Sequence, residues 1–284
     1  MTHLDTQLMF ANFNIPFSLF ALGAGLLLLK PHPAFAAAVS ANLLQTIHTS
    51  GIENPSFFPK SSPDPSDIAY LSLKNTLLDC DAEVDEVPDL FTGDNLFEIS
   101  RSGILLNTYS TTTSSRTGYS NEPTGCVFDP VSGHLFISDD AQKRVFELSP
   151  DSGGNFTLDS PRTSFSTLSV CGTNADPEGV AFGDGTLFII DGTNAELYKV
   201  KPGPDGLFNG VGETCTGFDT SALVLDPEGV AYDPDTPGHL YVIGDDPENR
   251  LIDFTTAGTW ARTIDIRISA NEPDNPAGLT AVPK

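Results

Sequence analysis

Basic residues are scarce in this chain: 14 Lys and Arg stand against 38 Asp and Glu, a formal net charge of −24 over 284 residues. A surface with this excess of carboxylates repels DNA, RNA and anionic lipid, so we expect no nucleic-acid partner. The 25 Gly and 22 Pro favour many turns over long helices. The 39% of hydrophobic residues, 19 Phe included, is enough to build a core.

Local catalytic motifs are missing as well. The sequence contains no C-x-x-C, no G-x-S-x-G and no H-E-x-x-H, which argues against zinc-ribbon, thioredoxin, α/β-hydrolase and zincin chemistry. His134 and His239 stand at the same place before two copies of a repeated apolar run. A histidine that recurs with a repeat is typical of a turn or packing residue rather than of a general base.

No apolar run is long enough to span a bilayer. The longest, residues 17–29, has 13 residues and ends at Lys30, whereas a spanning helix needs about 20. Ala34, Phe35 and Ala36 follow as an A-x-A cleavage pattern. We predict a signal peptide at residues 1–36 and a short leader at 37–42, hence a secreted or periplasmic protein with no membrane contact after cleavage. Because no Lys or Arg precedes the apolar run, an uncleaved anchor is the alternative.

Four cysteines, Cys80, Cys126, Cys171 and Cys215, remain after cleavage. In an exported chain they allow two disulfides in three connectivities, with buried free thiols as the alternative. Cys171 and Cys215 both lie in segments that lead into a repeat, so we favour that pair.

One seven-residue pattern occurs five times, with starts 58, 54, 50 and 49 residues apart. Its first residue is acidic in four copies and Asn in the fifth, proline follows, and the fourth residue is Gly in four copies. The copies occupy residues 64–70, 122–128, 176–182, 226–232 and 275–281.

Further runs follow each of the first four copies. The second runs, at 76–81, 134–139, 186–191 and 239–244, are largely apolar, as central strands are. The third runs, at 95–99, 144–148, 196–200 and 250–254, alternate polar and apolar residues. Fourth, more variable runs precede each copy, at 44–48, 106–109, 165–168, 218–221 and 262–265.

Four strands in each repeat of about 50 residues predict an all-β fold, a β-propeller. We expect the propeller at residues 43–284, as a monomer with about five four-stranded blades and six as the alternative. The last blade is incomplete in this chain. We expect residues 43–48 to supply its outer strand and residue 275 to begin its inner strand.

The copies at 176–191 and 226–244 resemble exported bacterial propellers of the SdiA-regulated and NHL-like class. The resemblance covers residues 43–284 and implies the propeller architecture. The chain is also remotely similar to calcium-dependent lactonase and phytase-like propellers. This similarity assigns no catalytic residue to the chain, because one fold hosts many activities.

Acidic residues recur where the first strand begins and the second strand ends, near one mouth of a propeller channel. Carboxylates gathered there repel one another unless a cation lies among them, and Ca²⁺ takes six to eight oxygen ligands. The alternative is turn chemistry, because Asp-Pro-Glu-Gly suits a turn and Asp hydrogen-bonds nearby backbone. The candidate Ca²⁺ ring consists of Asp64, Asp81, Glu122, Asp139, Asp176, Asp191, Asp226 and Asp245.

Two functions are consistent with such a ring. The first is an exported binding scaffold with Ca²⁺ at the channel mouth, whose partner is a protein, a glycan or a small neutral ligand. The second is a calcium-dependent hydrolase of the lactonase or esterase type, in which Ca²⁺ polarises the substrate. The shortage of basic residues argues against a phosphate substrate.

Overall fold

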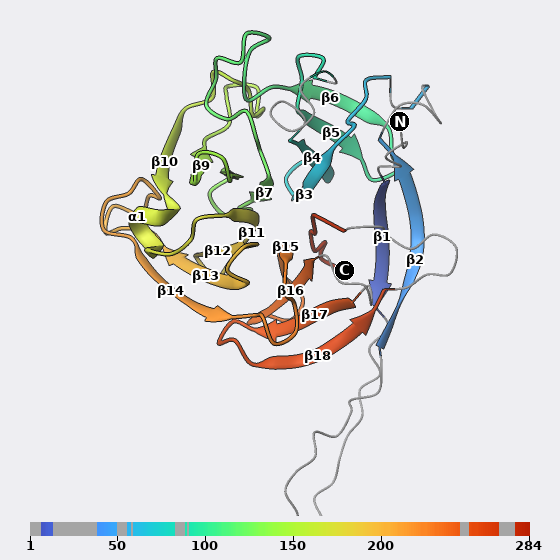
Figure 1. Ribbon diagram of the computed structural model, residues 1–284. Helices are drawn as coiled ribbons and strands as arrows, with labels where there is room; N and C mark the ends of the chain where they lie inside the picture. Colours follow the sequence, from blue (N-terminus) through green and yellow to red (C-terminus); the bar gives the residue numbers. More distant parts are fainter. Residues whose placement is uncertain are drawn as a thin grey trace, which may run out of the picture.

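The computed structural model describes residues 7–13, 39–49, 56–57, 59–82, 89, 91–244, 250–266 and 276–284. These residues form an all-β propeller in which four sheets of antiparallel strands surround a central axis (Figure 1). Within each blade the strands follow one another from the axis outward, so consecutive strands are neighbours.

Each blade corresponds to one copy of the sequence repeat. Blade 1 comprises β3 (Pro65–Leu71), β4 (Thr76–Asp81), β5 (Leu96–Ser100) and β6 (Leu105–Tyr109). Blade 2 comprises β7 (Gly125–Phe128), β8 (Leu135–Asp139), β9 (Arg144–Leu148) and β10 (Arg162–Ser166). Blade 3 comprises β11 (Pro177–Gly183), β12 (Thr186–Asp191), β13 (Glu196–Lys201) and β14 (Thr214–Asp219). Blade 4 comprises β15 (Pro227–Tyr232), β16 (His239–Gly244), β17 (Arg250–Thr255) and β18 (Trp260–Asp265).

Two N-terminal strands extend the fourth blade. β2 (Val39–His48) pairs in parallel with β18, and β1 (Gln7–Phe13) pairs antiparallel with β2. In Figure 1 both strands lie between blade 4 and blade 1, with the C-terminal segment on their inner side. Residues 43–48 therefore lie in a strand, the longer β2, but this strand extends blade 4 and does not complete a fifth blade. β1 falls within the predicted signal peptide, most of which lies outside the described residues.

The prediction of about five blades, or six, is wrong as a count of sheets, because the described residues form four blades. The fifth copy of the repeat contributes residues 276–284, which carry no strand. This segment nevertheless lies between the inner strands of blades 4 and 1. A Cβ on Gly229 would lie 2.6 Å from the Ala277 carbonyl oxygen, and one on Gly278 would lie 2.3 Å from the Asp67 Cα.

Apolar seams join the blades, because both faces of each second strand are buried. Leu78 and Cys80 of β4 share one cluster with Leu135 and Ile137 of β8. On the other face of β8, Phe136 shares a cluster with Leu187 and Ile189 of β12. Alternation along a strand sends successive side chains into the two neighbouring seams. The near-continuous apolar second runs follow from this arrangement.

Two disulfides reinforce the seams and loops. Cys80 of β4 is bonded to Cys126 of β7, so one bridge links blades 1 and 2. Cys171, in the short helix α1 (Thr167–Cys171), is bonded to Cys215 of β14, which is the pair favoured by sequence. The bridges are compatible with an extracellular location. Among the described residues, no helix has the length and apolar character to cross a bilayer.

Candidate functional site at the mouth of the channel

A cavity of about 280 Å³ lies where the inner strands begin and the second strands end. It gathers residues from all five copies of the repeat, and five of its side chains are carboxylates. None of the described residues that line it is basic. The lining consists of Asp64, Pro65, Ser66, Ala82, Glu122, Thr124, Asp140, Glu178, Glu228 and Ala277.

The repeat explains why these residues converge. Position three of the five copies is occupied by Ser66, Thr124, Glu178, Glu228 and Ala277, and all five line the cavity. The inner strands show a register irregularity just after the motif proline in three blades. Such an irregularity redirects side chains at a strand end. In these blades it occurs next to the third motif residue, whose side chain lines the cavity.

Two overlapping groups of carboxylates could hold a metal ion. Glu122, Asp139 and Asp140 offer oxygen atoms within 4.8 Å of one another, and so do Asp140, Asp176 and Glu178. Asp140 belongs to both groups, and its Oδ1 accepts a hydrogen bond from the Thr124 hydroxyl at 3.1 Å. Oxygen atoms of this kind and number are the donor set that Ca²⁺ prefers.

Three predicted ligands, Asp81, Asp139 and Asp191, end the second strands of blades 1 to 3, and each is fully buried. Each accepts hydrogen bonds from the loop that leads into its own inner strand. Asp81 accepts from the Asp64 N–H at 3.1 Å, Asp139 from the Ser120 hydroxyl at 2.7 Å, and Asp191 from the Ala175 N–H at 2.9 Å. These bonds are the turn chemistry that the sequence offered as the alternative.

Burial also changes the protonation of two of these acids. It raises the pKa of Asp81 to about 7, against the hydrogen bonds from Ser62 and Asp64 that lower it. The pKa of Asp139 is likewise raised, chiefly by burial. A bound cation would oppose both shifts, because it favours the ionised carboxylate.

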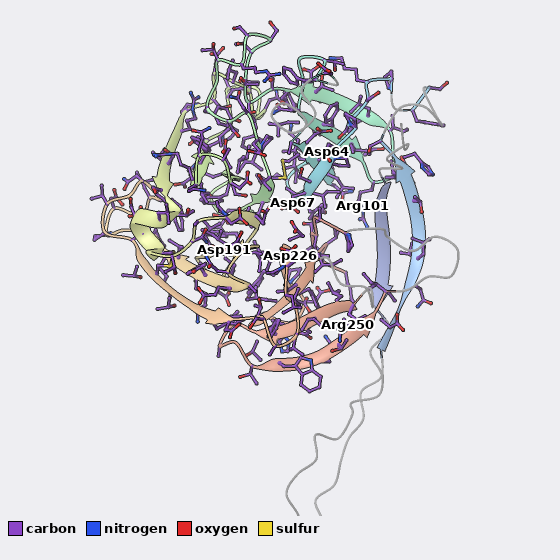
Figure 2. The ribbon with its side chains drawn as sticks, viewed as in Figure 1. Asp64, Asp67, Arg101, Asp191, Asp226 and Arg250 are labelled. Atoms are coloured by element: carbon purple, nitrogen blue, oxygen red, sulfur yellow. A yellow bond between two sulfur atoms is a disulfide. The ribbon has the colours of Figure 1, made fainter. Side chains whose placement is uncertain are left out.

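The first-position acids divide between the mouth and its rim. Asp64 and Glu122 line the cavity, and Asp176 joins one carboxylate group while accepting a hydrogen bond from the Thr193 N–H at 3.0 Å. Asp226 is exposed. It lies near Asp176, because a Cβ placed on Gly192 would be 3.3 Å from the Asp176 Oδ2 and 3.5 Å from the Asp226 Oδ1. Figure 2 shows Asp226 nearer to the centre of the ring than Asp191. Asp245 lies outside the described residues.

Asp67 lies near the centre of the ring (Figure 2). It is the fourth residue of its motif copy, where the other copies have Gly125, Gly179, Gly229 and Gly278. Those glycines lie against neighbouring backbone, since a Cβ on Gly125 or Gly179 would lie 2.6 Å from a carbonyl oxygen. The single side chain at this level is therefore the Asp67 carboxylate, which is 2% exposed.

The Asp67 carboxylate joins inner strands from different blades. Oδ1 accepts from the N–H groups of Ile68 at 2.8 Å and Leu279 at 2.9 Å, and Oδ2 accepts from Cys126 at 2.9 Å. Burial raises its pKa to about 7, although these backbone donors lower it. The deviation from Gly at position four was the sequence signal for this residue, and our sequence reasoning did not use it.

Comparisons with known proteins leave the function open. No protein-family model matches the chain, and no curated protein matches it. Among solved structures, the nidogen/laminin complex is 15% identical with a TM-score of 0.49, covering 85% of this chain and 76% of that chain. Streptogramin B lyase is 12% identical with a TM-score of 0.43, covering 76% and 72%. The WD40 domain of Neurospora crassa Pan2 is 12% identical with a TM-score of 0.36, covering 55% and 40%.

Similarities this remote carry no argument about activity. The assignment as a propeller comes from the strand order of the four blades themselves, and fold alone does not define function.

Proposed function

We propose that this protein is an exported binding scaffold whose channel mouth holds Ca²⁺. The observation that carries the proposal is the pair of carboxylate groups that share Asp140. Carboxylates this close repel one another, and a divalent cation between them removes the repulsion. Five acids would supply the core of the site: Glu122, Asp139, Asp140, Asp176 and Glu178.

The remaining coordination positions face the cavity. Ca²⁺ accepts six to eight oxygen ligands with flexible geometry, so hydroxyl or carbonyl oxygens of a partner can complete its shell. A protein, a glycan or a small neutral ligand offers such oxygens. A free anionic ligand is disfavoured by Asp64 and Glu228, which stand in the same cavity.

A thermal melt of the mature chain with EDTA, CaCl₂ or MgCl₂ tests the metal site. A ligand at 100 times its Kd stabilises the native state by about 2.7 kcal/mol, which raises Tm by a few degrees. We expect this rise with calcium, a smaller one with magnesium, and its loss in Asp140→Asn. Asp159→Asn is the matched control, because Asp159 is exposed in a loop of the same blade. Equal melts in EDTA and calcium would refute the site.

The cavity also favours a second function, a calcium-dependent hydrolase of the lactonase or esterase type. Its volume of about 280 Å³ beside Asp140 gives room for a small substrate next to the ion. Ca²⁺ at that place would polarise the substrate carbonyl and stabilise the developing oxyanion. A screen of lactones and esters with calcium and with EDTA tests it: turnover must require calcium and must fall in Asp140→Asn.

Export and membership of the SdiA-regulated, NHL-like class belong to the same proposal. Expression of the full chain in a bacterial host, followed by N-terminal sequencing of the exported product, tests the first. A mature N-terminus at Ala37 is expected. Retention of the whole chain in the membrane fraction would favour the uncleaved anchor.

A further inference from the structure

A serine, a histidine and a glutamate are aligned at the end of blade 2 opposite the channel mouth. The Ser149 Oγ lies 3.2 Å from His134 Nε2, and His134 Nδ1 lies 2.7 Å from Glu147 Oε1. Antiparallel pairing brings them together: Leu135 of β8 stands opposite Leu148 of β9, so His134 and Ser149 flank that pair. The distances match those between a nucleophile, its base and the group that orients the base.

The protonation pattern suits this role. An ionised carboxylate only accepts hydrogen bonds, so the proton of the neutral imidazole belongs on Nδ1 and Nε2 is free to accept from the Ser149 hydroxyl. Glu147 is held from its other side, where Oε2 accepts from the Phe208 N–H at 3.0 Å. Glu147 is only 6% exposed, and its hydrogen bond to Nδ1 favours the tautomer whose Nε2 can take the serine proton.

The serine and the imidazole can be reached from solvent. The His134 side chain is 24% exposed and Ser149 is half-buried. Two exposed apolar residues belong to the same end of the blades: Val131, three residues before His134, and Leu73, whose Cδ1 is 3.8 Å from the place of a Cβ on Gly133. Such a surface suits the apolar chain of an acyl group better than a charged one.

We propose that Ser149 is a nucleophilic serine, with His134 as its base and Glu147 as a positioning residue, and that it takes acyl groups from activated esters of apolar acids. Oγ forms a bond to the carbonyl carbon while His134 Nε2 takes the hydroxyl proton. The ester C–O bond then breaks, and His134 gives the proton to the leaving alcohol. Water later cleaves the acyl-serine, which releases the acid and returns the proton to Oγ.

The surrounding backbone predicts that this reaction is slow. The N–H groups of Val131, Ser132 and Gly133 all donate to Asp129. The Ser149 N–H donates to the Pro161 carbonyl at 2.8 Å. Because these donors are occupied, they cannot stabilise an oxyanion, which is commonly the largest contribution to acyl-transfer catalysis. Formation and hydrolysis of the acyl-serine both pass through an oxyanion, so both steps are slowed. An activated ester offsets this in the first step through its good leaving group, and we therefore expect an accumulating acyl-serine rather than rapid turnover.

Blade 4 contains a matched control. His239 Nδ1 lies 2.7 Å from Asp253 Oδ1, which repeats the His134–Glu147 pair. The residue in the place of Ser149 is Thr255, directly opposite His239, and its Oγ1 accepts from the Thr259 N–H at 3.1 Å. The hydroxyl of Thr255 is thus engaged in a turn, and blade 4 lacks the serine.

The test incubates the folded full chain with p-nitrophenyl butyrate or a fluorophosphonate probe and maps adducts by peptide mass spectrometry. We expect one adduct, on Ser149, that is absent in Ser149→Ala and forms at least about 100-fold more slowly in His134→Gln. Glu147→Gln should slow labelling and change its pH profile. Thr255→Ala and His239→Gln should label like the parent chain, and circular dichroism melts confirm that each variant folds.

Other results would overturn the assignment. An unlabelled Ser149 in the folded chain, or labelling that persists unchanged in His134→Gln, would show that the three residues form a structural hydrogen-bond chain. Because the channel mouth lies at the other end of the blades, EDTA should leave labelling intact. Labelling that requires calcium and persists in Ser149→Ala would support the calcium-dependent hydrolase and refute the assignment to Ser149.

Discussion

The Asp67 Oδ1 accepts a hydrogen bond from the Leu279 N–H at 2.9 Å, across 212 residues of chain. This bond links the first inner strand of the propeller to the C-terminal segment, which carries no strand among the described residues. The same carboxylate also accepts from Cys126 in blade 2. The Asp67 side chain therefore links three segments around the axis, namely the inner strands of blades 1 and 2 and the C-terminal segment.

Asp67→Gly, which copies the other four repeats, should destabilise the protein. It leaves the buried N–H of Cys126 without its acceptor, at a cost of about 1–3 kcal/mol, and removes the acceptor of the half-buried Leu279 N–H. Urea unfolding should show a lower midpoint, and limited proteolysis should cut the C-terminal segment sooner. Asp159→Gly, in an exposed loop, controls for the added backbone freedom. Equal midpoints for both variants would contradict the role given to Asp67.

Stability should fall as the pH rises from about 4 to 7. Burial raises the pKa of both Asp67 and Asp81 to about 7 from an ordinary 3.8. In this window the native state keeps protons that the unfolded chain has released, so the free energy of unfolding decreases with pH. Melts in EDTA should show this slope, and it should be shallower in Asp67→Asn with Asp81→Asn. Stability that increases over this range would contradict the prediction.

Asp79→Ile should stabilise the protein. Asp79 is fully buried in β4, and neither of its carboxylate oxygens has a hydrogen-bond partner among the described residues. Burial and the nearby charge of Asp81 raise its pKa well above the ordinary value. The other blades have Ile137, Ile189 and Val242 at this place.

A buried polar group without a hydrogen-bond partner costs about 1–3 kcal/mol, and a packed apolar side chain in its place removes this cost. Chemical unfolding at pH 7 measures this gain. The reverse change in blade 2, Ile137→Asp, should destabilise and serves as the matched control. If Asp79→Ile lowers the midpoint, Asp79 has a partner that its surroundings do not reveal.

Removal of the Cys171–Cys215 bridge should weaken the protein without unfolding it. The two cysteines are 44 residues apart, and closing a loop of that size contributes about 3–4 kcal/mol in the chain-entropy model. The double change Cys171→Ser with Cys215→Ser should lower the urea midpoint accordingly. Peptide mapping without reductant should recover both pairs from the parent chain, and any other pairing would refute the assignment.

The second and third strands of each blade could be predicted from the sequence to within about a residue, whereas the variable fourth strands begin three to five residues before the predicted runs in blades 2 and 3 and in β2. The runs at 76–81 and 186–191 coincide with β4 and β12, because both faces of a second strand are buried and its residues are largely apolar. The number of blades could not be predicted in the same way. The number of motif copies gives the number of inner segments, but a blade also needs partner strands that pair with its inner segment. The segment at 276–284, which contains the described part of the fifth copy, forms no strand.

The site was predicted less completely than the fold. The first-position acids Asp64, Glu122 and Asp176 were expected at the mouth and lie there, but Glu178 and Glu228 were assigned to turns. Their direction depends on the irregularity after the motif proline, which spacing alone does not reveal. His134 and Ser149 become neighbours only through the register of β8 with β9, and no local motif encodes that register.

The four fourth-position glycines and the Asp67 side chain close the inner end of the cavity at the mouth. Below the third-position residues the inner strands meet backbone to backbone, and a buried carboxylate fills the axis. A ligand must enter and leave by the same opening, so a large partner can insert only a projecting tip. The cavity therefore selects partners by the size of the projecting tip rather than by the size of the whole partner.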